Sequence, residues 1–389
     1  MSRLDELIAE LCPDGVEYKK LKDVSEMKRG TSLTKSKSVA GNIPVVSGGK
    51  EPAFYCNTFN RNGETITVAG SGAGAGYVQY WNIPIFANDC FTVKGTNLAE
   101  TKYLYYLLAN IQDKISDTKK GGGVPHVHIS DVDKFSVPVP PLEVQREIIR
   151  ILDNFTELTA ELTAELTARK KQYEYYHNCL MDFSNREVEY KSVGELFEIK
   201  NGLNKEKSAF GQGQPIINFT DVYNKRWLGN GTFHGLVDVT DEEIKRYSAK
   251  KGDVFFTRTS ETKEDIGMSS TLIEDIPNCV FSGFVLRARP TTSLLLPKFC
   301  SYYFSTNKVR DTIIRYASFT TRATTTGPKL SKIMVPILPL DEQEKIVTIL
   351  DRFDTICNDL SSGLPAEIEA RQKQYEYYRD KLLTFKQLA

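Results

Sequence analysis

The sequence lacks the patterns that mark membrane proteins, secreted proteins and several enzyme classes. No apolar run reaches the roughly 18 residues that a bilayer-spanning helix needs. Residues 1–6 hold two acids and no apolar stretch, so we do not expect a signal peptide. The seven cysteines are scattered and form no CxxC pair, which argues against a disulfide framework and a zinc site and favours a reducing cytoplasm.

Two motifs of nucleotide chemistry are also missing. No GxxxxGK[ST] phosphate loop is present, so ATP use by this chain is not expected. No Asn-Pro-Pro-Tyr-like methyltransferase motif occurs either. The lack of a recognisable catalytic triad is weaker evidence against a hydrolase-like activity, because the fold rather than sequence spacing brings triad residues together.

Charge is balanced overall but unevenly distributed. The 389 residues, enough for two domains with separate cores, include 50 basic and 50 acidic side chains. Basic residues are in excess over 13–141 and 186–335, whereas acidic residues are in excess over 142–185 and 336–389. The alternation is compatible with DNA contact by the two basic segments, although a stronger basic patch would indicate it better.

The main feature is an internal repeat. Val137–Gln145 (VPVPPLEVQ) returns 198 residues later as Val335–Gln343 (VPILPLDEQ). The block KQYEYY at 171–176 returns at 373–378, a shift of 202 residues. The beginnings, VEYK at 16–19 and 188–191, also match, whereas the segments between them diverge. A repeated frame with different contents is what two similar modules that recognise different things would show.

Each copy of the frame ends in a helical pattern. After residue 141, apolar side chains recur at heptad spacing, with Thr159 and Arg169 as weak points, and the second copy repeats the spacing. The simplest arrangement pairs the two helices antiparallel within the chain. The predicted seam and partner surface comprises Ile148, Leu152, Phe155, Leu162, Leu166, Tyr173, Tyr176, Leu180, Ile346, Leu350, Phe353, Leu360, Tyr375 and Tyr378.

Two details of the helices stand out. The sequence SSGLP at 361–365 predicts a break near Gly363, with Pro365 in the first turn of a restarted helix. Residues 156–168 are a four-residue TAEL repeat, in which each unit would lengthen the helix by about 6 Å. The repeat is either a helical filler or a ruler between two domains.

These motifs together resemble the specificity subunits of Type I restriction–modification systems, in particular those with tandem TAEL units in the central helix. The resemblance covers essentially the whole chain. It divides the chain into an N-terminal helical segment (1–15), a first target-recognition domain (16–141), a central long helix (142–185), a second target-recognition domain (186–338) and a C-terminal long helix (339–389).

The resemblance implies an α+β fold, with two pseudo-symmetric globular target-recognition domains joined by two long antiparallel coiled-coil helices. It implies a non-catalytic subunit that reads a bipartite, asymmetric DNA sequence, one half per domain, with a spacer tied to the number of TAEL units. It also implies docking of two methyltransferase subunits and then of restriction/translocase subunits. No cofactor is expected on this chain, because S-adenosylmethionine, ATP and Mg would be bound by the partners.

The variable domains contain patterns for short strands followed by a helix. We expect strands at Ile43–Val46, Glu64–Val68, Tyr77–Trp81, Pro215–Phe219, Asp253–Thr257 and Val280–Arg289, with helices at Thr101–Ile115 and Lys298–Tyr316. The candidate DNA contacts are Lys28, Arg29, Gly72, Gly74, Lys119, Lys120, His126, Lys200, Arg226, Arg258, Arg322 and Lys329.

Each candidate has a plainer interpretation. The glycine-rich segment 70–76 could approach a phosphate or form a turn, but it precedes a strand pattern and is therefore no dinucleotide fingerprint. The segments 119–128 and 318–329 could contact DNA or be solvated loops. Arg258 could read a base or form an ion pair, and Trp227, beside Arg226, could stack or pack in a core. The pair His126 and His128 lacks nearby residues to complete a metal site.

Two other functions stay open at this point: a protein-only coiled-coil adaptor, and a divergent stand-alone DNA methyltransferase or nuclease. Methylation by the purified chain alone would favour the enzyme. Absent or salt-insensitive DNA binding would favour the adaptor, because counterion release makes true DNA binding fall steeply with salt.

Overall fold

The fold is taken from a computed structural model, which describes residues 2–121, 123–359 and 361–388. The chain divides into two compact units, unit 1 from residues 1–164 and 367–389 and unit 2 from residues 165–366. Both units combine strands and helices, which confirms the predicted α+β class. Leu360, which we predicted in the helix seam, lies outside the described residues. Within the described ranges, no helix is long and apolar enough to cross a bilayer.

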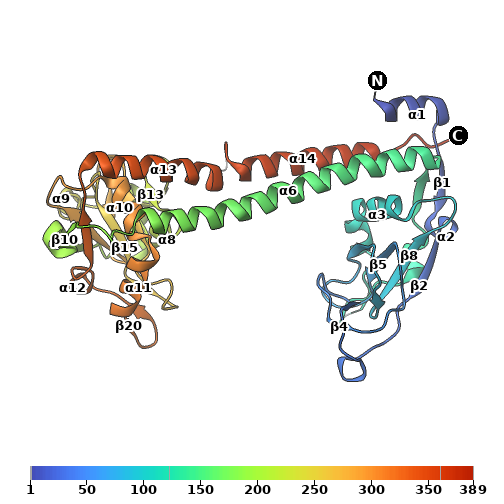
Figure 1. The fold of residues 1–389 in the computed structure, drawn as a ribbon, viewed down its shortest axis with the longest axis horizontal. Helices are drawn as coiled ribbons and strands as arrows, with labels where there is room; N and C mark the ends of the chain where they lie inside the picture. The colour runs from blue at the N-terminus through green and yellow to red at the C-terminus, as the bar shows by residue number, and fades with distance from the viewer. Residues whose placement is uncertain (1, 122, 360, 389) are drawn as a thin grey trace. The chain divides into compact units, whose positions relative to one another are not determined.

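Unit 1 is built around a four-stranded antiparallel sheet in the order β2-β8-β5-β6. Its central strand β5 is fully buried, and α3 packs against the sheet (Figure 1). The elements of unit 1 are α1 (Arg3–Leu11), β1 (Glu17–Lys20), α2 (Leu21–Val24), β2 (Ser25–Arg29), η1 (Lys35–Lys37), β3 (Ile43–Val46), β4 (Phe54–Cys56), β5 (Thr65–Ala69), β6 (Val78–Trp81), β7 (Phe86–Ala87), β8 (Cys90–Gly95), α3 (Thr101–Asn110), α4 (Gln112–Ser116), α5 (Ile129–Val132) and β9 (Ser136–Val139), with the first part of α6 (Leu142–Leu180) and most of α14 (Leu364–Leu382).

Unit 2 repeats this plan around a larger sheet in the order β11-β19-β15-β17-β13. Its elements are the second part of α6, β10 (Glu189–Ser192), α7 (Val193–Leu196), β11 (Phe197–Asn201), η2 (Lys207–Ala209), β12 (Phe210–Ile217), α8 (Phe219–Asn224), β13 (Trp227–Leu228), β14 (Leu236–Val237), α9 (Asp241–Tyr247), β15 (Val254–Thr257), β16 (Thr259–Ser260), β17 (Ser269–Leu272), β18 (Val280–Phe281), β19 (Val285–Pro290), α10 (Pro297–Phe304), α11 (Asn307–Tyr316), β20 (Ser318–Phe319), β21 (Ala323–Thr324), α12 (Gly327–Leu330), β22 (Met334–Ile337) and α13 (Leu340–Asn358).

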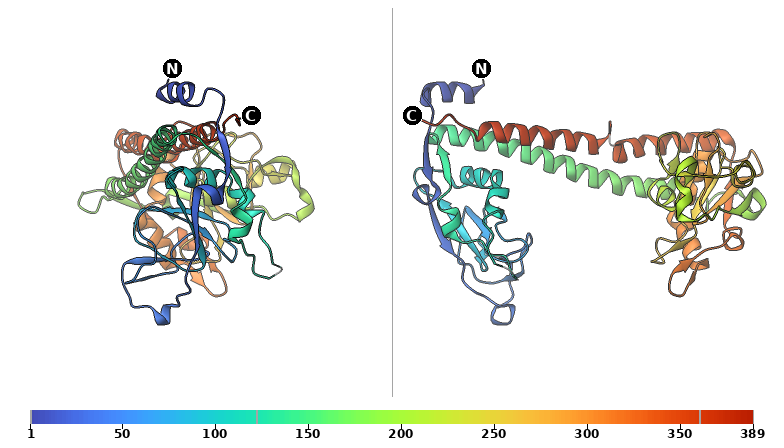
Figure 2. Two further views of the ribbon diagram at one scale, coloured as in Figure 1. Left: turned by 90° about the vertical axis from the view of Figure 1, so that its right-hand side faces the viewer. Right: turned by 180° about the vertical axis from the view of Figure 1, so that it is seen from behind.

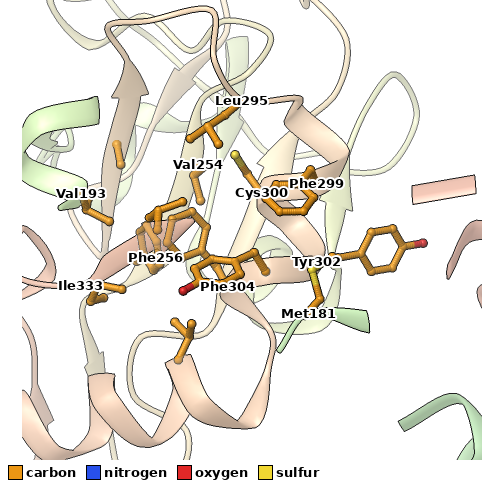
Figure 3. Close-up of a cluster of buried hydrophobic side chains, with 14 of the residues drawn as sticks. Met181, Val193, Val254, Phe256, Leu295, Phe299, Cys300, Tyr302, Phe304 and Ile333 are labelled. Carbon is orange, nitrogen blue, oxygen red and sulfur yellow. The ribbon is translucent and has the colours of Figure 1, made fainter. Parts of the chain in front are cut away.

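The core of unit 2 lies between its sheet and α10. Figure 3 shows Phe256 of β15 beside Phe304 of α10, and their rings meet edge to face at 5.2 Å between centroids. Both side chains are fully buried. Edge-to-face packing of this kind adds stabilisation beyond the area that the rings bury. Phe256 and Phe304 therefore help to hold α10 against the sheet of unit 2.

The frame of the repeat is a matched pair of strands in each unit. β1 pairs antiparallel with β9 in unit 1, and Glu17 lies opposite Val139. β10 pairs in the same way with β22 in unit 2, where Glu189 lies opposite Ile337. Each ladder brings the start of a copy beside the proline-rich strand that leads into its long helix. The repeated sequence therefore closes both ends of each variable domain.

Three predicted elements are divided in the structure. The predicted helix Thr101–Ile115 is two helices, α3 and α4, on either side of Ile111. The predicted strand Val280–Arg289 is wrong as a single element, because β18 pairs parallel with β12 before the chain crosses into β19 of the main sheet. The predicted helix Lys298–Tyr316 is also two helices. The Thr306 side chain accepts a hydrogen bond from the Val309 amide at the start of α11, an N-cap that separates α11 from α10.

The long helix α6 has 39 residues and lies within the central helix predicted over 142–185. In unit 1 its Phe155 ring packs against Tyr375 and Tyr378 of α14, at 6.5 and 5.5 Å between centroids. Further along α6, in unit 2, Tyr173 and Tyr176 pack against the Phe353 ring of α13 at 6.4 and 5.6 Å. The two sets of contacts are equivalent under the repeat. In each unit, one copy supplies the phenylalanine and the other supplies the tyrosines.

Burial along the seam is strongest near the two domains. Ile148, Leu152, Tyr173, Ile346 and Leu350 are buried, whereas the middle of the seam is thinner. The half-buried members are Phe155, Leu162, Leu166, Leu180, Phe353 and Tyr375, and Tyr176 and Tyr378 are exposed. The polar Arg169 is exposed and pairs with Glu165 on its own helix, as expected of a weak point.

The second long helix is broken where the sequence predicted. α13 ends at Asn358 and α14 begins at Leu364, so Pro365 lies in the first turn of α14. A Cβ at Gly363 would stand 2.4 Å from the Thr355 carbonyl oxygen, so only glycine fits the turn. In unit 1 the C-terminal segment runs beside the chain that follows α1 (Figure 2). The Val16 amide donates to the Lys386 carbonyl at 2.9 Å.

Candidate nucleic-acid interface

The glutamine of each P-L-x-x-Q motif ties the long helix to the variable domain beside it. Gln145 is fully buried, and its Nε2 donates to the carbonyl oxygens of Leu98 and Pro140 at 3.0 and 2.8 Å. Its Oε1 accepts from the Glu100 amide at 2.9 Å, just before α3. One side chain therefore fixes the start of α6, the end of the frame strand and the start of α3.

Gln343 makes the same three bonds in unit 2. Its Nε2 donates to the Leu294 and Leu338 carbonyl oxygens at 2.8 and 2.9 Å, and its Oε1 accepts from the Leu296 amide at 2.9 Å. Gln343 is also fully buried. Satisfying three backbone groups from a buried amide holds the geometry tightly, because an unpaired buried polar group is costly.

An aspartate of the repeated I-L-D motif forms a second tie in each unit. Asp153 accepts from Lys102 Nζ at 2.7 Å and from the Tyr106 hydroxyl at 2.5 Å. Burial and the bond to Asp153 raise the pKa of Tyr106 far above its ordinary value, so its hydroxyl stays a donor. Asp351 repeats the arrangement in unit 2.

In unit 2, Asp351 accepts from Lys298 Nζ at 2.6 Å and from the Tyr302 hydroxyl at 2.7 Å. Burial and the bond to Asp351 also raise the pKa of Tyr302 well above its ordinary value. The helices α3 and α10, which carry these partners, lie on the sheets of the two variable domains. Each domain is thus bound to α6 or α13 through an ion pair and a tyrosine.

Three variable loops of unit 1 are joined at one end of the sheet by two backbone hydrogen bonds. Gly70 follows β5, Asp89 precedes β8, and Val127 lies in the segment before α5. The Gly70 amide donates to the Asp89 carbonyl at 3.1 Å, and the Gly70 carbonyl accepts from the Val127 amide at 3.0 Å. We call this junction the corner of unit 1.

Unit 2 contains the same corner with different side chains. The Arg258 amide donates to the Phe284 carbonyl at 3.0 Å, and the Arg258 carbonyl accepts from the Thr325 amide at 3.0 Å. Arg258 follows β15, which pairs with β19 as β5 pairs with β8. Gly70 and Arg258, Asp89 and Phe284, and Val127 and Thr325 are therefore equivalent positions.

A cavity of about 540 Å³ lies at the corner of unit 1. It brings together the predicted candidates Arg29 and His126 from segments far apart in sequence. It is lined by Arg29, Gly30, Ser32, Leu33, Thr34, Gly70, Asn88, Asp89, Cys90, Phe91, His126, Val127, His128 and Ile129. The His126 and His128 rings stack at 6.2 Å between centroids, and the described residues offer no cluster of three potential metal ligands.

The glycines of segment 70–76 form a turn beside this cavity. Gly72 has a φ of +81°, and a Cβ at Gly74 would stand 2.2 Å from the Gly48 carbonyl oxygen. Chain geometry thus accounts for both glycines. Gly30 directly follows β2. A side chain does not fit there either, because a Cβ at this position would lie 2.1 Å from the Asn88 carbonyl oxygen.

The lysine candidates of unit 1 lie at the surface around the cavity. Lys28 is exposed and pairs with Glu26 on its own strand at 2.5 Å. Lys119 is exposed, and Lys120 pairs with Asp131 at 2.5 Å. The Lys28–Glu26 pair is exposed on both sides and such pairs are worth little in stability, so Lys28 can exchange its partner for a phosphate oxygen.

A second cavity of about 410 Å³ lies beside the corner of unit 2 and is lined in part by Arg322 and Phe284. β16, which follows Arg258, pairs with β21, so the segment 318–329 lies against the Arg258 region. Arg258 is half-buried and forms no ion pair with any described residue. Lys329 donates to the Ser318 hydroxyl, and Lys200 is half-buried near the end of β11.

Arg226 is a correction to the predicted set of DNA contacts. Its guanidinium pairs with Asp354 of α13 at 2.9 Å and donates to the Tyr173 hydroxyl of α6. It also lies over the rings of Tyr173 and Tyr302, at 5.2 and 5.0 Å from the centroids. These contacts occupy Arg226 in joining the domain to its helices, so we withdraw it as a DNA contact. The neighbouring Trp227 packs against the core, in agreement with the core-packing interpretation.

Sequence reasoning missed Asn88, Asp89 and Phe284. They lie in short loops that no motif marks, and their place at the corners follows only from strand pairing. Phe284 is 64% exposed. A comparison of the residues before β8 and β19 would have found Asp89 and Phe284, but only with the strands already aligned.

The chain matches the family described as the Type I restriction modification DNA specificity domain twice, over residues 13–169 and 185–370. It is 30% identical to a putative type I restriction enzyme specificity subunit of Haemophilus influenzae, over 95% of this chain and 96% of the relative. It is 34% identical to a type I restriction enzyme specificity subunit of Escherichia coli, over 73% of this chain and 70% of the relative.

Solved structures show the same fold. The specificity subunit from M. genitalium matches with a TM-score of 0.59 and 16% identity, covering 95% of this chain and 96% of that chain. A chain from a study of complex assembly and conformational transition of the type I system matches with a TM-score of 0.60 and 17% identity, over 95% and 98%. The double family match and the full-length relatives together show that the chain belongs to the non-catalytic DNA specificity subunits of Type I restriction–modification systems.

Proposed function

We propose that this chain reads a bipartite, asymmetric DNA sequence, one half with each variable domain, through the corners of units 1 and 2. The observation that carries the proposal is the corner itself. The same two backbone hydrogen bonds hold Gly70 and Arg258 in equivalent places, while the side chains around them differ. A constant scaffold with variable side chains is suited to reading two different sequences, since base readout depends on a few side chains at base edges.

Mapping of adenine methylation across the genome of a host that expresses this chain with its methyltransferase partner tests the proposal. We expect one two-part motif with unequal halves and a spacer of fixed length. The motif should vanish when the chain is deleted. A host whose methylation does not change on deletion would contradict DNA reading and favour a protein-only adaptor.

The TAEL segment at 156–168 is proposed as the ruler that sets the spacer. It lies within the unbroken helix α6, which begins in unit 1 and ends in unit 2. Each four-residue unit adds about 6 Å and about 40° of rotation to an α-helix. Both changes act on the register with which two domains meet a DNA helix, which supports a ruler over a simple filler.

Two methyltransferase subunits are the proposed direct partners, and restriction/translocase subunits would join through them. Matched exposed tyrosines support a duplicated docking surface, because Tyr175 is 66% exposed and its counterpart Tyr377 is 63% exposed. Tyrosine is enriched where proteins bind one another. S-adenosylmethionine, ATP and Mg are assigned to those partners, and the cytoplasm, where the DNA lies, is the proposed location.

A further inference from the structure

Asp89 places a carboxylate at the corner of unit 1, beside basic side chains. The residue is exposed and lines the same cavity as Arg29 and His126. Among the described residues, it forms no ion pair, and its side chain accepts a hydrogen bond only from the Ser71 hydroxyl. The Arg29 guanidinium is therefore left available to phosphates, and the Asp89 carboxylate is not neutralised by an ion pair within the described residues.

An unpaired carboxylate in a DNA-facing cavity repels phosphate oxygens, and covering it without a donor would be costly. Carboxylate oxygens only accept hydrogen bonds. In the major groove the donors that base edges offer are the exocyclic amino groups, N4 of cytosine and N6 of adenine. The charge of Asp89 therefore suits a base edge and does not suit the DNA backbone.

The loop that carries Asp89 is held on several sides. The Asp89 carbonyl accepts from the Gly70 amide at 3.1 Å, and the neighbouring Asn88 Oδ1 accepts from the Leu33 amide at 2.9 Å. Asn88 Nδ2 donates to the Ser47 hydroxyl at 3.0 Å. A Cβ at Gly70 would stand 3.3 Å from Asp89 Oδ1, so glycine leaves room beside the carboxylate. The group is held in place before any ligand arrives, which favours discrimination between bases.

Unit 2 offers no acceptor at the equivalent position. Phe284 takes the place of Asp89, and Arg258 takes the place of Gly70. A guanidinium is a donor that pairs with the O6 and N7 acceptors of guanine. The two corners thus differ in hydrogen-bonding polarity, as two domains that read unequal half-sites require.

We propose that Asp89 is a specificity-determining residue of the first domain and accepts a hydrogen bond from the exocyclic amino group of one base in the first half-site. The inference rests on the proposed function, because it assumes that unit 1 reads DNA at its corner. It adds the residue, the chemical group on the base and the direction of the hydrogen bond.

The test uses the chain in complex with its methyltransferase partner, with Asp89→Ala and Asp89→Asn compared with the unchanged chain. Methylation mapping gives the motif, and binding of duplexes that vary each position of the first half-site gives the discrimination. We expect Asp89→Ala to lower discrimination at one position by about tenfold to a hundredfold. The second half-site and the spacer should not change.

Asp89→Asn separates chemistry from folding, because it keeps the size of the side chain. Asparagine pairs with the N6 and N7 atoms of adenine, so this variant should favour adenine at the affected position. Ser71→Ala removes the bond to the carboxylate but keeps Asp89, and Asp117→Ala removes an exposed acid from the same domain. Both controls should retain the motif.

Three results would overturn the inference. The first is an unchanged motif in both Asp89 variants. The second is a uniform rise in affinity for all duplexes without a change in motif. The third is a loss of base discrimination in the first half-site that Ser71→Ala also produces. In each case the unchanged chain still directs a two-part motif, so the proposed function stands. If the unchanged chain directs no motif at all, the proposed function fails instead.

Discussion

Replacement of Gln145 by alanine should loosen the attachment of the first variable domain to α6. The substitution removes both donors and the acceptor that hold Leu98, Pro140 and Glu100. Leu98 is exposed, so water can replace its lost bond. The Pro140 carbonyl and the Glu100 amide lie further from solvent, and each orphaned group costs about 1–2 kcal/mol.

We therefore expect Gln145→Ala to destabilise the local structure by about 2–4 kcal/mol. Hydrogen exchange measures the effect directly, because the Glu100 amide is one of the groups released. Its exchange should accelerate by about 30-fold to 1,000-fold under conditions in which exchange reports local opening. Amides of unit 2, including Leu296 beside the equivalent Gln343, should keep their protection.

Gln374→Ala is the matched control, since Gln374 is exposed on α14 and accepts a hydrogen bond from Arg371 of the same helix. Its effect should stay within about 0.5 kcal/mol. If the Glu100 amide keeps its protection in Gln145→Ala, or if Gln374→Ala has the same effect, the clamp role of the motif glutamine is refuted.

Three further predictions concern the ruler, a base contact and pH. Deletion of Thr159–Leu162 should shorten α6 by about 6 Å and change the preferred spacer in methylation mapping, and an unchanged spacer would refute the ruler. Arg258→Ala should relax only the half-site of the second domain, whereas a uniform loss with a salt slope lower by about 1 would make Arg258 a phosphate contact. Burial lowers the pKa of His177 from 6.5 to about 4, so the unfolded chain binds more protons between these values and stability falls as pH drops below 6.5. Thermal melts from pH 6.5 to 5 should show this loss, and His177→Phe should lack it if the assignment is right.

The frame could be predicted from the sequence because it is repeated and periodic. The heptad spacing gave the length of α6, and the pair of residues Gly363 and Pro365 gave the break between α13 and α14. The proline and glutamine of each motif indicated where a helix begins. They did not indicate that Gln145 and Gln343 reach back to the variable domains, because those contacts join residues distant in sequence.

The corners could not be predicted, for a physical reason. Gly70 and Arg258, Asp89 and Phe284, and Val127 and Thr325 are separated by three different offsets, because the loops between strands differ in length in the two copies. The bonds that make them equivalent are between backbone atoms, which leave no trace in side-chain identity. Arg226 misled the prediction because a basic residue in a loop gives no sign that Asp354 and Tyr173 will occupy it.

The exchange of aromatic partners along the helices has an evolutionary consequence. Phe155 of the first copy packs on Tyr378 of the second, and Phe353 of the second packs on Tyr176 of the first. A substitution at one of these positions therefore alters a contact made by the other copy. Each copy thus restricts which aromatic substitutions the other can accept. The second variable domain shares this constraint, because its Arg226 donates a hydrogen bond to Tyr173 on the helix of the first copy.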